Sequence, residues 1–219
     1  DDVRKNDKIY VIINSSQMSE TLEVFGHDEK ISKNILIVGA GTVGQSLFDA
    51  YSAAFPKANF LVWNRTHERA LFMVKNKSNA VAVENLEAGV KRADIITCAT
   101  MSKQPIIKGE WLIPGQHLDL IGAYRPDMRE VDDLALCRST KFVDSYDTTL
   151  DHIGELKIPL KNNVISRADI LADFYGLGNF IRRSNDEITF FKNGGGAHLD
   201  LIVAKYILTA WEKNKYPKS

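Results

Sequence analysis

The chain has 219 residues, enough for one large domain or for one domain with an appended lobe. Its 28 Lys and Arg balance its 28 Asp and Glu, so no chain-wide basic field attracts nucleic acid or anionic lipid. Hydrophobic residues make up 44% and charged residues 26%, which is typical of a folded globular chain and excludes a disordered one.

The first thirty residues predict little regular structure. Residues 9–13 form a β-branched run typical of a short strand, but no partner strand is evident. Residues 15–34 are polar with scattered apolar positions. We therefore expect residues 1–30 to be a connector.

A strand–turn–helix–strand pattern begins at residue 35. The apolar run 35–38 is typical of a strand buried on both faces of a parallel sheet. The turn 39–44 follows at once and opens a helix that ends near Pro56, before a second apolar strand at 59–63. Together these segments form a βαβ unit.

The same alternation continues along the chain. Helices are predicted at 67–75, 86–92 and 132–137, and strands at 81–83, 93–99, 117–122 and 141–144. Alternation of this kind predicts an α/β fold of the Rossmann type, a doubly wound parallel sheet with helices on both faces. We expect this domain to span residues 31–192.

The end of the chain has a different pattern. A helix is predicted at 168–174, a strand at 187–191 and a glycine triplet at 194–196. Residues 193–219 then predict a closing helix, whose apolar positions Leu199, Ile202, Val203, Tyr206, Ile207 and Ala210 have helical spacing. We expect that face to pack back on another lobe.

The glycine turn predicts a dinucleotide site because of its place between a strand and a helix. There Gly39 makes the tight turn, Gly41 admits a pyrophosphate to the backbone, and Gly44 lets helix and strand approach. The phosphates would lie at the positive end of the helix.

The end of the second strand favours NADPH over NADH. No carboxylate stands where an NAD-specific fold presents one to the ribose. Asn64 can bond the ribose, while Arg65 and Thr66 offer a guanidinium and a hydroxyl to a 2′-phosphate. The alternative is that Arg65 is only a surface charge at a helix start.

The carboxyl ends of the fourth and fifth strands border the same crevice. They are expected to form the nicotinamide side of the site, although Thr100 can equally be a hydroxyl that caps a loop. The residues predicted to bind the cofactor are Gly39, Ala40, Gly41, Thr42, Val43, Gly44, Asn64, Arg65, Thr66, Ala99, Thr100, Met101, Gly122 and Ala123.

Several motifs together resemble the ornithine cyclodeaminase/mu-crystallin family. They are the glycine turn, 63–66, 93–96, Pro105-Ile106, 109–111, Pro114-Gly115, 122–132, 143–145 and 191–196. The resemblance implies a homodimeric NAD(P)-dependent oxidoreductase that acts on an amino acid or a cyclic imine. Asn-Arg-Thr at 64–66 and Gly-Ala-x-Arg-Pro-Asp from Gly122 are similar to the NADPH-preferring ketimine reductase branch.

Two departures from that family limit the prediction. Cyclodeaminases carry an aspartate where this chain has Tyr124, which disfavours cyclodeamination and leaves imine reduction or amino-acid dehydrogenation. The family's N-terminal substrate domain is largely missing, so residues 1–30 would be its remnant, the homodimer depends on that domain, and no catalytic lysine or arginine is assigned.

Each candidate functional residue outside the predicted cofactor-binding set also has a purely structural explanation. Tyr124 can donate a proton or simply pack, and Arg125 can bind a carboxylate or hold its own loop. Residues 194–196 can bring N–H groups to the nicotinamide or a substrate anion, or act as a hinge. A non-catalytic dinucleotide-binding protein or sensor remains the alternative function.

The cysteines, the histidines and the hydropathy of the chain indicate in which compartment it occurs and whether it binds a metal. Cys98 and Cys137 are expected to be buried thiols in a reducing compartment, and neither they nor the five histidines have metal-ligand spacing, so no metal is predicted. No run of about 18 uncharged apolar residues occurs and the charged start does not resemble a signal peptide. We expect a cytoplasmic protein that binds neither membrane nor nucleic acid.

Overall fold

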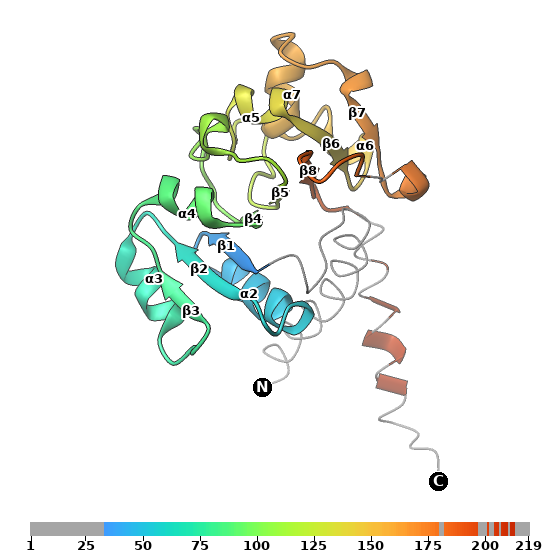
Figure 1. Ribbon diagram of the computed structural model, residues 1–219. Coiled ribbons are helices and arrows are strands. Elements are labelled where there is room, and N and C mark those ends of the chain that lie inside the picture. The colour runs from blue at the N-terminus through green and yellow to red at the C-terminus, as the bar shows by residue number, and fades with distance from the viewer. Residues whose placement is uncertain are drawn as a thin grey trace.

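The computed structural model describes residues 33–179 and 182–196, together with isolated positions between 201 and 212 (Figure 1). The strands are β1 (Asn34–Val38), β2 (Asn59–Trp63), β3 (Ala80–Ala82), β4 (Ile95–Cys98), β5 (His117–Leu120), β6 (Ser139–Val143), β7 (Ile170–Ala172) and β8 (Ile188–Lys192). The α-helices are α2 (Thr42–Ala54), α3 (His67–Val74), α4 (Leu86–Arg92), α5 (Asp133–Arg138), α6 (Tyr146–Thr149) and α7 (Gly154–Lys161). Short 3₁₀ helices are η1 (Gly109–Trp111), η2 (Arg167–Asp169) and η3 (Phe174–Asn179).

The eight strands form one parallel sheet in the order β3-β2-β1-β4-β5-β8-β6-β7. The strand order reverses between β1 and β4, which is where a doubly wound sheet opens a crevice at the carboxyl ends of its strands. The predicted Rossmann-type fold is therefore confirmed. The described strands lie between residues 34 and 192, while the predicted domain limits remain a prediction.

Helices cover both faces of the sheet because residues along each strand alternate between them. In β1, Ile35 and Ile37 pack with α2 and α3, whereas Leu36 and Val38 belong to a second cluster with α4, α5 and α7 (Figure 1). All four side chains are fully buried. This two-sided core fixes β1, and hence the turn that follows it, between β2 and β4 in the interior of the sheet.

The second half of the sheet differs from the sequence-based prediction. The predicted helix at 168–174 is wrong: η2 is followed there by strand β7, which pairs with β6 through Lys141 and Ile170. Helices α6 and α7 were not predicted, and α7 contains Pro159. The predicted strand at 187–191 is confirmed as β8, but it lies inside the sheet, between β5 and β6.

One cysteine also differs from prediction. Cys98 is buried as expected, but Cys137 is exposed, because α5 turns Ala135 and Leu136 toward the core and Cys137 toward solvent. The expected strand at 9–13, the connector at 1–30, the second lobe and the packing of the closing helix lie outside the described residues. Across the described part of the chain, no helix is long and apolar enough to span a membrane.

Candidate functional site

The glycine turn packs against β2 and β4 more closely than any side chain permits. Gly39 has φ +112°, and a Cβ there would lie 2.7 Å from the carbonyl oxygen of Ala99. A Cβ on Gly44 would lie 1.8 Å from the carbonyl oxygen of Gly39. The Gly39 N–H donates to the Trp63 carbonyl at 2.8 Å. Two of the three motif glycines are thus required by the fold itself.

The third motif glycine has the opposite environment. A Cβ on Gly41 would meet nothing within 4 Å, and Gly41 is the N-cap residue of α2 without a side-chain hydrogen bond. Its carbonyl accepts from Gln45 N–H at 2.9 Å, but the N–H groups of the first helical turn have no intrahelical acceptor. Open space beside the positive end of a 13-residue helix fits a pyrophosphate.

Asn64 fastens the glycine turn to the end of β2. Its Oδ1 accepts the N–H of Ala40 at 3.0 Å, and its Nδ2 donates to the carbonyl of Thr66 at 2.9 Å. We predicted that Asn64 bonds a ribose, and the structure gives it a positioning role that sequence reasoning missed. Its backbone partners make it a bridge between the turn after β1 and the start of α3.

Arg65 and Thr66 face solvent at the start of α3. Both are exposed, and Thr66 is the N-cap residue of α3 without a side-chain capping bond. Arg65 forms no ion pair with any residue that the structure describes. Both side chains are therefore exposed to solvent where β2 leads into α3, and their role toward a phosphate stays a prediction.

Beside the glycine turn, the loops after β4 and β5 meet at Glu130. Its Oε1 accepts the N–H of Thr100 at 2.8 Å and the Thr100 hydroxyl at 2.9 Å, and its Oε2 accepts the N–H of Ala123 at 3.1 Å. A Cβ on Gly122 would lie 2.2 Å from the N and O atoms of Thr100. Ala123 is buried, whereas Met101 is 77% exposed at the rim.

A buried group of charged side chains lies beneath these strand ends. Glu130, Glu155 and Lys192 are fully buried, and Asp144 is as well. Lys192 Nζ donates to the carbonyls of Leu120 and Asn193, at 2.9 and 2.6 Å, which ties the ends of β5 and β8 together. Glu130, Asp144 and Lys192 fall within motifs of the sequence analysis, whereas Glu155 does not, and none of the four was assigned to a site.

Burial sets the protonation of this group. It raises the pKa of Glu155 to about 7, with a further rise from the Glu130 charge, although Glu155 accepts the backbone N–H groups of Glu130 and Val131. It lowers the pKa of Lys192, while the surrounding carboxylates oppose that shift. Within this group, the carboxyl of Glu155 therefore exchanges its proton near neutral pH.

Another buried carboxylate, that of Asp119, lies on the α2 side of the sheet. Asp119 accepts the Tyr51 hydroxyl at 2.9 Å and the Thr97 hydroxyl at 3.0 Å. Burial raises its pKa to about 6. This contact fastens α2 to β4 and β5, and so fixes the helix whose N-terminus faces the crevice.

The glycine triplet continues β8 at the same edge of the sheet. The N–H of Gly195 donates to Asp144 Oδ2 at 2.8 Å, and Gly195 has φ +73° with open space at its Cβ position. A Cβ on Gly194 would lie 2.5 Å from Thr149 Cγ2. The loop is fixed by these contacts at Gly194 and Gly195, while its role toward a ligand stays a prediction.

Tyr124 and Arg125 lie at the rim. Tyr124 is 57% exposed, and the Arg125 guanidinium lies 5.9 Å from its ring centre. Arg125 also pairs with Asp127, which pairs with Lys103. These contacts match the expectation that Arg125 holds its own loop.

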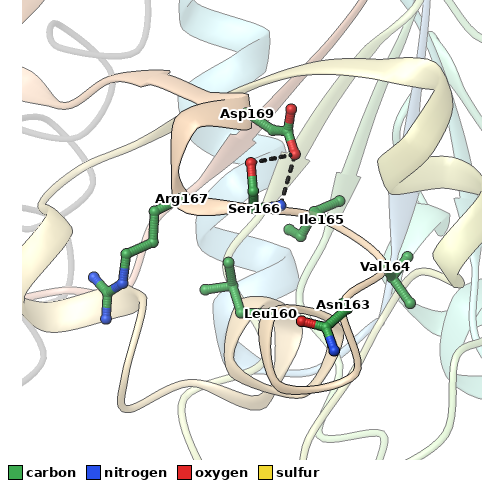
Figure 2. Close-up of a pocket in the computed structure, with 7 residues that line it drawn as sticks. All are labelled: Leu160, Asn163, Val164, Ile165, Ser166, Arg167 and Asp169. Atoms are coloured by element: carbon green, nitrogen blue, oxygen red, sulfur yellow. Dashed lines mark hydrogen bonds between the residues drawn. The ribbon is translucent and has the colours of Figure 1, made fainter.

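The structure also has a pocket away from the crevice (Figure 2). It measures about 410 Å³ and is lined by Leu160, Asn163, Val164, Ile165, Ser166, Arg167 and Asp169. The Asp169 carboxylate accepts hydrogen bonds from the N–H and the hydroxyl of Ser166, and Arg167 forms a salt bridge with Asp151. Because η2 leads directly into β7, this pocket lies at the amino edge of the sheet, opposite the glycine turn. The described residues contain no group of three acidic, histidine or cysteine side chains suited to a metal.

Comparisons with known proteins agree with this geometry. The model of the ornithine cyclodeaminase/mu-crystallin family matches residues 28–215. The chain is 48% identical over 184 residues to Delta(1)-pyrroline-2-carboxylate reductase of Paracoccus denitrificans, covering 80% of this chain and 58% of that protein. It is 33% identical over 186 residues to ketimine reductase mu-crystallin of Mus musculus, covering 83% and 56%.

A solved structure shares the fold over most of the chain. Delta(1)-pyrroline-2-carboxylate reductase of Thermococcus litoralis, in complex with NADH and L-proline, superposes with a TM-score of 0.81 at 27% identity. The match covers 90% of this chain and 63% of that one. The chain thus spans less than two thirds of the length of each of these three relatives.

Proposed function

The chain belongs to the ornithine cyclodeaminase/mu-crystallin family, and from this premise we propose that it forms the cofactor-binding part of an NADPH-dependent reductase of a small cyclic imine. The substrate class is suggested by relatives that are named pyrroline-2-carboxylate and ketimine reductases. The assignment of this activity to the whole protein is part of the proposal.

The observation that carries the proposal is the contrast among the three motif glycines. Gly39 and Gly44 are packed without room for a methyl group, while Gly41 faces open space at the start of α2. Its surroundings suit a pyrophosphate, and the loops after β4, β5 and β8 suit the nicotinamide half. The bound cofactor would supply the hydride, and this chain would bind and orient it.

The preference for NADPH rests on Arg65 and Thr66. Both are exposed beside the glycine turn, where a guanidinium and a hydroxyl can bind a 2′-phosphate. Because the Thermococcus litoralis relative was solved with NADH, the preference needs its own test. We expect NADPH to bind at least about tenfold more tightly than NADH, a difference of about 1.4 kcal/mol.

The test is a calorimetric titration of each nucleotide into wild-type protein, Arg65→Ala and Arg69→Ala. Arg65→Ala is expected to abolish the preference and to leave NADH binding unchanged. Arg69 is also exposed and lies in α3, so Arg69→Ala is a matched control that should keep the preference. A preference for NADPH that survives Arg65→Ala would contradict the role assigned to Arg65. If neither nucleotide binds, the proposed function is refuted and only the fold assignment stands.

Catalysis is tested separately, by following NADPH oxidation with pyrroline-2-carboxylate and piperideine-2-carboxylate. The assay uses this chain and a version extended N-terminally to the length of its relatives. We expect turnover in the extended protein. Nucleotide binding without turnover there would instead support a non-catalytic dinucleotide-binding protein or sensor.

A homodimer and a cytoplasmic location complete the proposal. The family suggests the dimer, and light scattering of the extended protein tests it. Fractionation of cells tests the location.

A further inference from the structure

Glu130 joins the two loops of the nicotinamide side through both oxygens of one fully buried carboxylate. Oε1 binds the N–H and the hydroxyl of Thr100, and Oε2 binds the N–H of Ala123. Hydrogen bonds to an ionised acceptor are among the stronger ones in proteins. Backbone bonds also link the two segments, from Gly122 N–H to the Cys98 carbonyl and from Arg129 N–H to the Ser102 carbonyl, both at 3.1 Å. Glu130 adds the side chain that joins Thr100 to Ala123.

The distance between the two loops, and between them and the glycine turn, can change little. A Cβ on Gly122 would lie 2.4 Å from Glu130 Oε1, and a Cβ on Gly39 would lie 3.4 Å from Thr100 Cγ2. Thr100 is thus packed between the glycine turn and the loop after β5. A displacement of Thr100 would change the width of the crevice directly.

The backbone of Glu130 is itself held in place by a side chain of helix α7. Its N–H donates to Glu155 Oε2 at 2.6 Å, and the N–H of Val131 donates to Glu155 Oε1 at 3.2 Å. Glu155 lies in the first turn of α7, and the preceding Gly154 N–H donates to the Arg125 carbonyl at 2.9 Å. The carboxylate of Glu130 therefore extends from a rigid base toward the crevice.

From this geometry we propose that Glu130 is a positioning residue for the nicotinamide half of the cofactor. It acts through Thr100 and Ala123, which it holds at a fixed separation from the glycine turn. The adenosine half is bound elsewhere, by the glycine turn and residues 64–66. The inference rests on the dinucleotide site proposed above and adds that its two halves are organised by different residues.

The experiment compares two ligands that share the adenosine half. Wild-type protein and Glu130→Gln are titrated with NADPH and with 2′-phospho-ADP-ribose, which lacks the nicotinamide. Because one charged acceptor is lost, Glu130→Gln is expected to weaken NADPH about tenfold and to leave the fragment unchanged. Glu187→Gln is the matched control, because Glu187 accepts the Thr140 hydroxyl before the amino end of β8. It should bind both ligands as the wild type does.

Equal weakening of both ligands by Glu130→Gln, or no weakening, would overturn the positioning role. If Glu130→Gln does not fold, Thr100→Val removes one of the three donors, and Thr100→Ser retains it. Thr100→Val should weaken NADPH alone, and Thr100→Ser should restore it; equal affinities in the two variants would overturn the proposal. A wild-type protein that binds neither ligand would refute the dinucleotide site itself, which is a different result.

Discussion

At the scale of single residues, Gly41 and Gly44 should respond to the same substitution in opposite ways. Gly44→Ala places a methyl group 1.8 Å from the Gly39 carbonyl oxygen, so we expect a loss of about 1–3 kcal/mol in the free energy of unfolding and loss of nucleotide binding. Gly41→Ala meets nothing within 4 Å, so stability should change by less than about 0.5 kcal/mol while NADPH binding weakens. Thermal denaturation and titration measure both effects, and unaltered binding in Gly41→Ala would show that this space does not face the cofactor.

Glu155 should make the protein less stable as the pH rises toward neutrality. Its pKa is about 7 in the folded protein against 4.5 ordinarily, so between these values the folded state binds more protons than the unfolded state. The free energy of unfolding therefore falls through that window, by roughly 3 kcal/mol from this group, and levels off above it. Asp119 acts in the same direction, with a pKa of about 6.

Urea denaturation at a series of pH values tests this. Glu155→Gln should give a shallower decline between about pH 5 and pH 7.5 than the wild type, with the Asp119 contribution remaining. Identical declines in the two proteins would contradict the assignment.

The sequence revealed the glycine turn but not the buried group of charged side chains, for a physical reason. A turn between strand and helix needs its glycines at fixed local spacing, so the motif is visible in six consecutive residues. Glu130 and Glu155 are 25 residues apart, in a loop and in helix α7, and Lys192 comes from strand β8. Only the folded sheet brings them together, and no local pattern distinguishes a buried glutamate from an exposed one.

At the scale of elements, Asn64 connects the glycine turn to the start of α3, and its removal should loosen the site without changing its nucleotide preference. Asn64→Ala loses the bonds to Ala40 and Thr66, so NADPH and NADH should both weaken by the same factor, several-fold. Asn79→Ala is the control, because Asn79 bonds the Ala58 carbonyl before the amino end of β2. A change in the ratio of the two affinities would assign Asn64 to the ribose instead.

Elements with strong local signals were predicted well, and those that depend on neighbours were not. Helix α4 has its capping Asn85 and basic residues in its last turn, and its predicted bounds 86–92 match. The segment 168–174 has apolar residues at helical spacing, but its pairing with β6 makes the middle of it a strand. Helix α7 was not predicted: it has no side-chain cap at Ile153 and it contains Pro159, so its local signals are weak.

At the scale of the whole molecule, β8 holds the two parts of the sheet together, so its core residues should contribute strongly to stability. Phe190 is fully buried, and Phe190→Ala is expected to cost about 3–5 kcal/mol. Phe72 is 80% exposed, so Phe72→Ala is the control and should change stability little. Chemical denaturation measures both, and a small effect at Phe190 would mean that β6 and β7 fold without support from β8.

The strand order could not be deduced from the order of elements along the chain. The alternation of strands and helices predicted a doubly wound sheet, and the first five strands follow that expectation. Nothing local to residues 188–192 indicates that they insert between β5 and β6. That insertion depends on how the strands pack and pair in the folded sheet. There Thr189 and Phe190 each pair with a residue of β5 and with a residue of β6.

The position of β8 also bears on how the protein is made. On the ribosome, β1 to β7 emerge before β8, so a nascent chain holds one group of five strands and one pair with nothing between them. Until residue 192 has emerged, the facing edges of β5 and β6 present unpaired N–H and C=O groups, which readily accept foreign strands. Late in synthesis the chain therefore passes through a stage that is prone to aggregation and suited to chaperone binding.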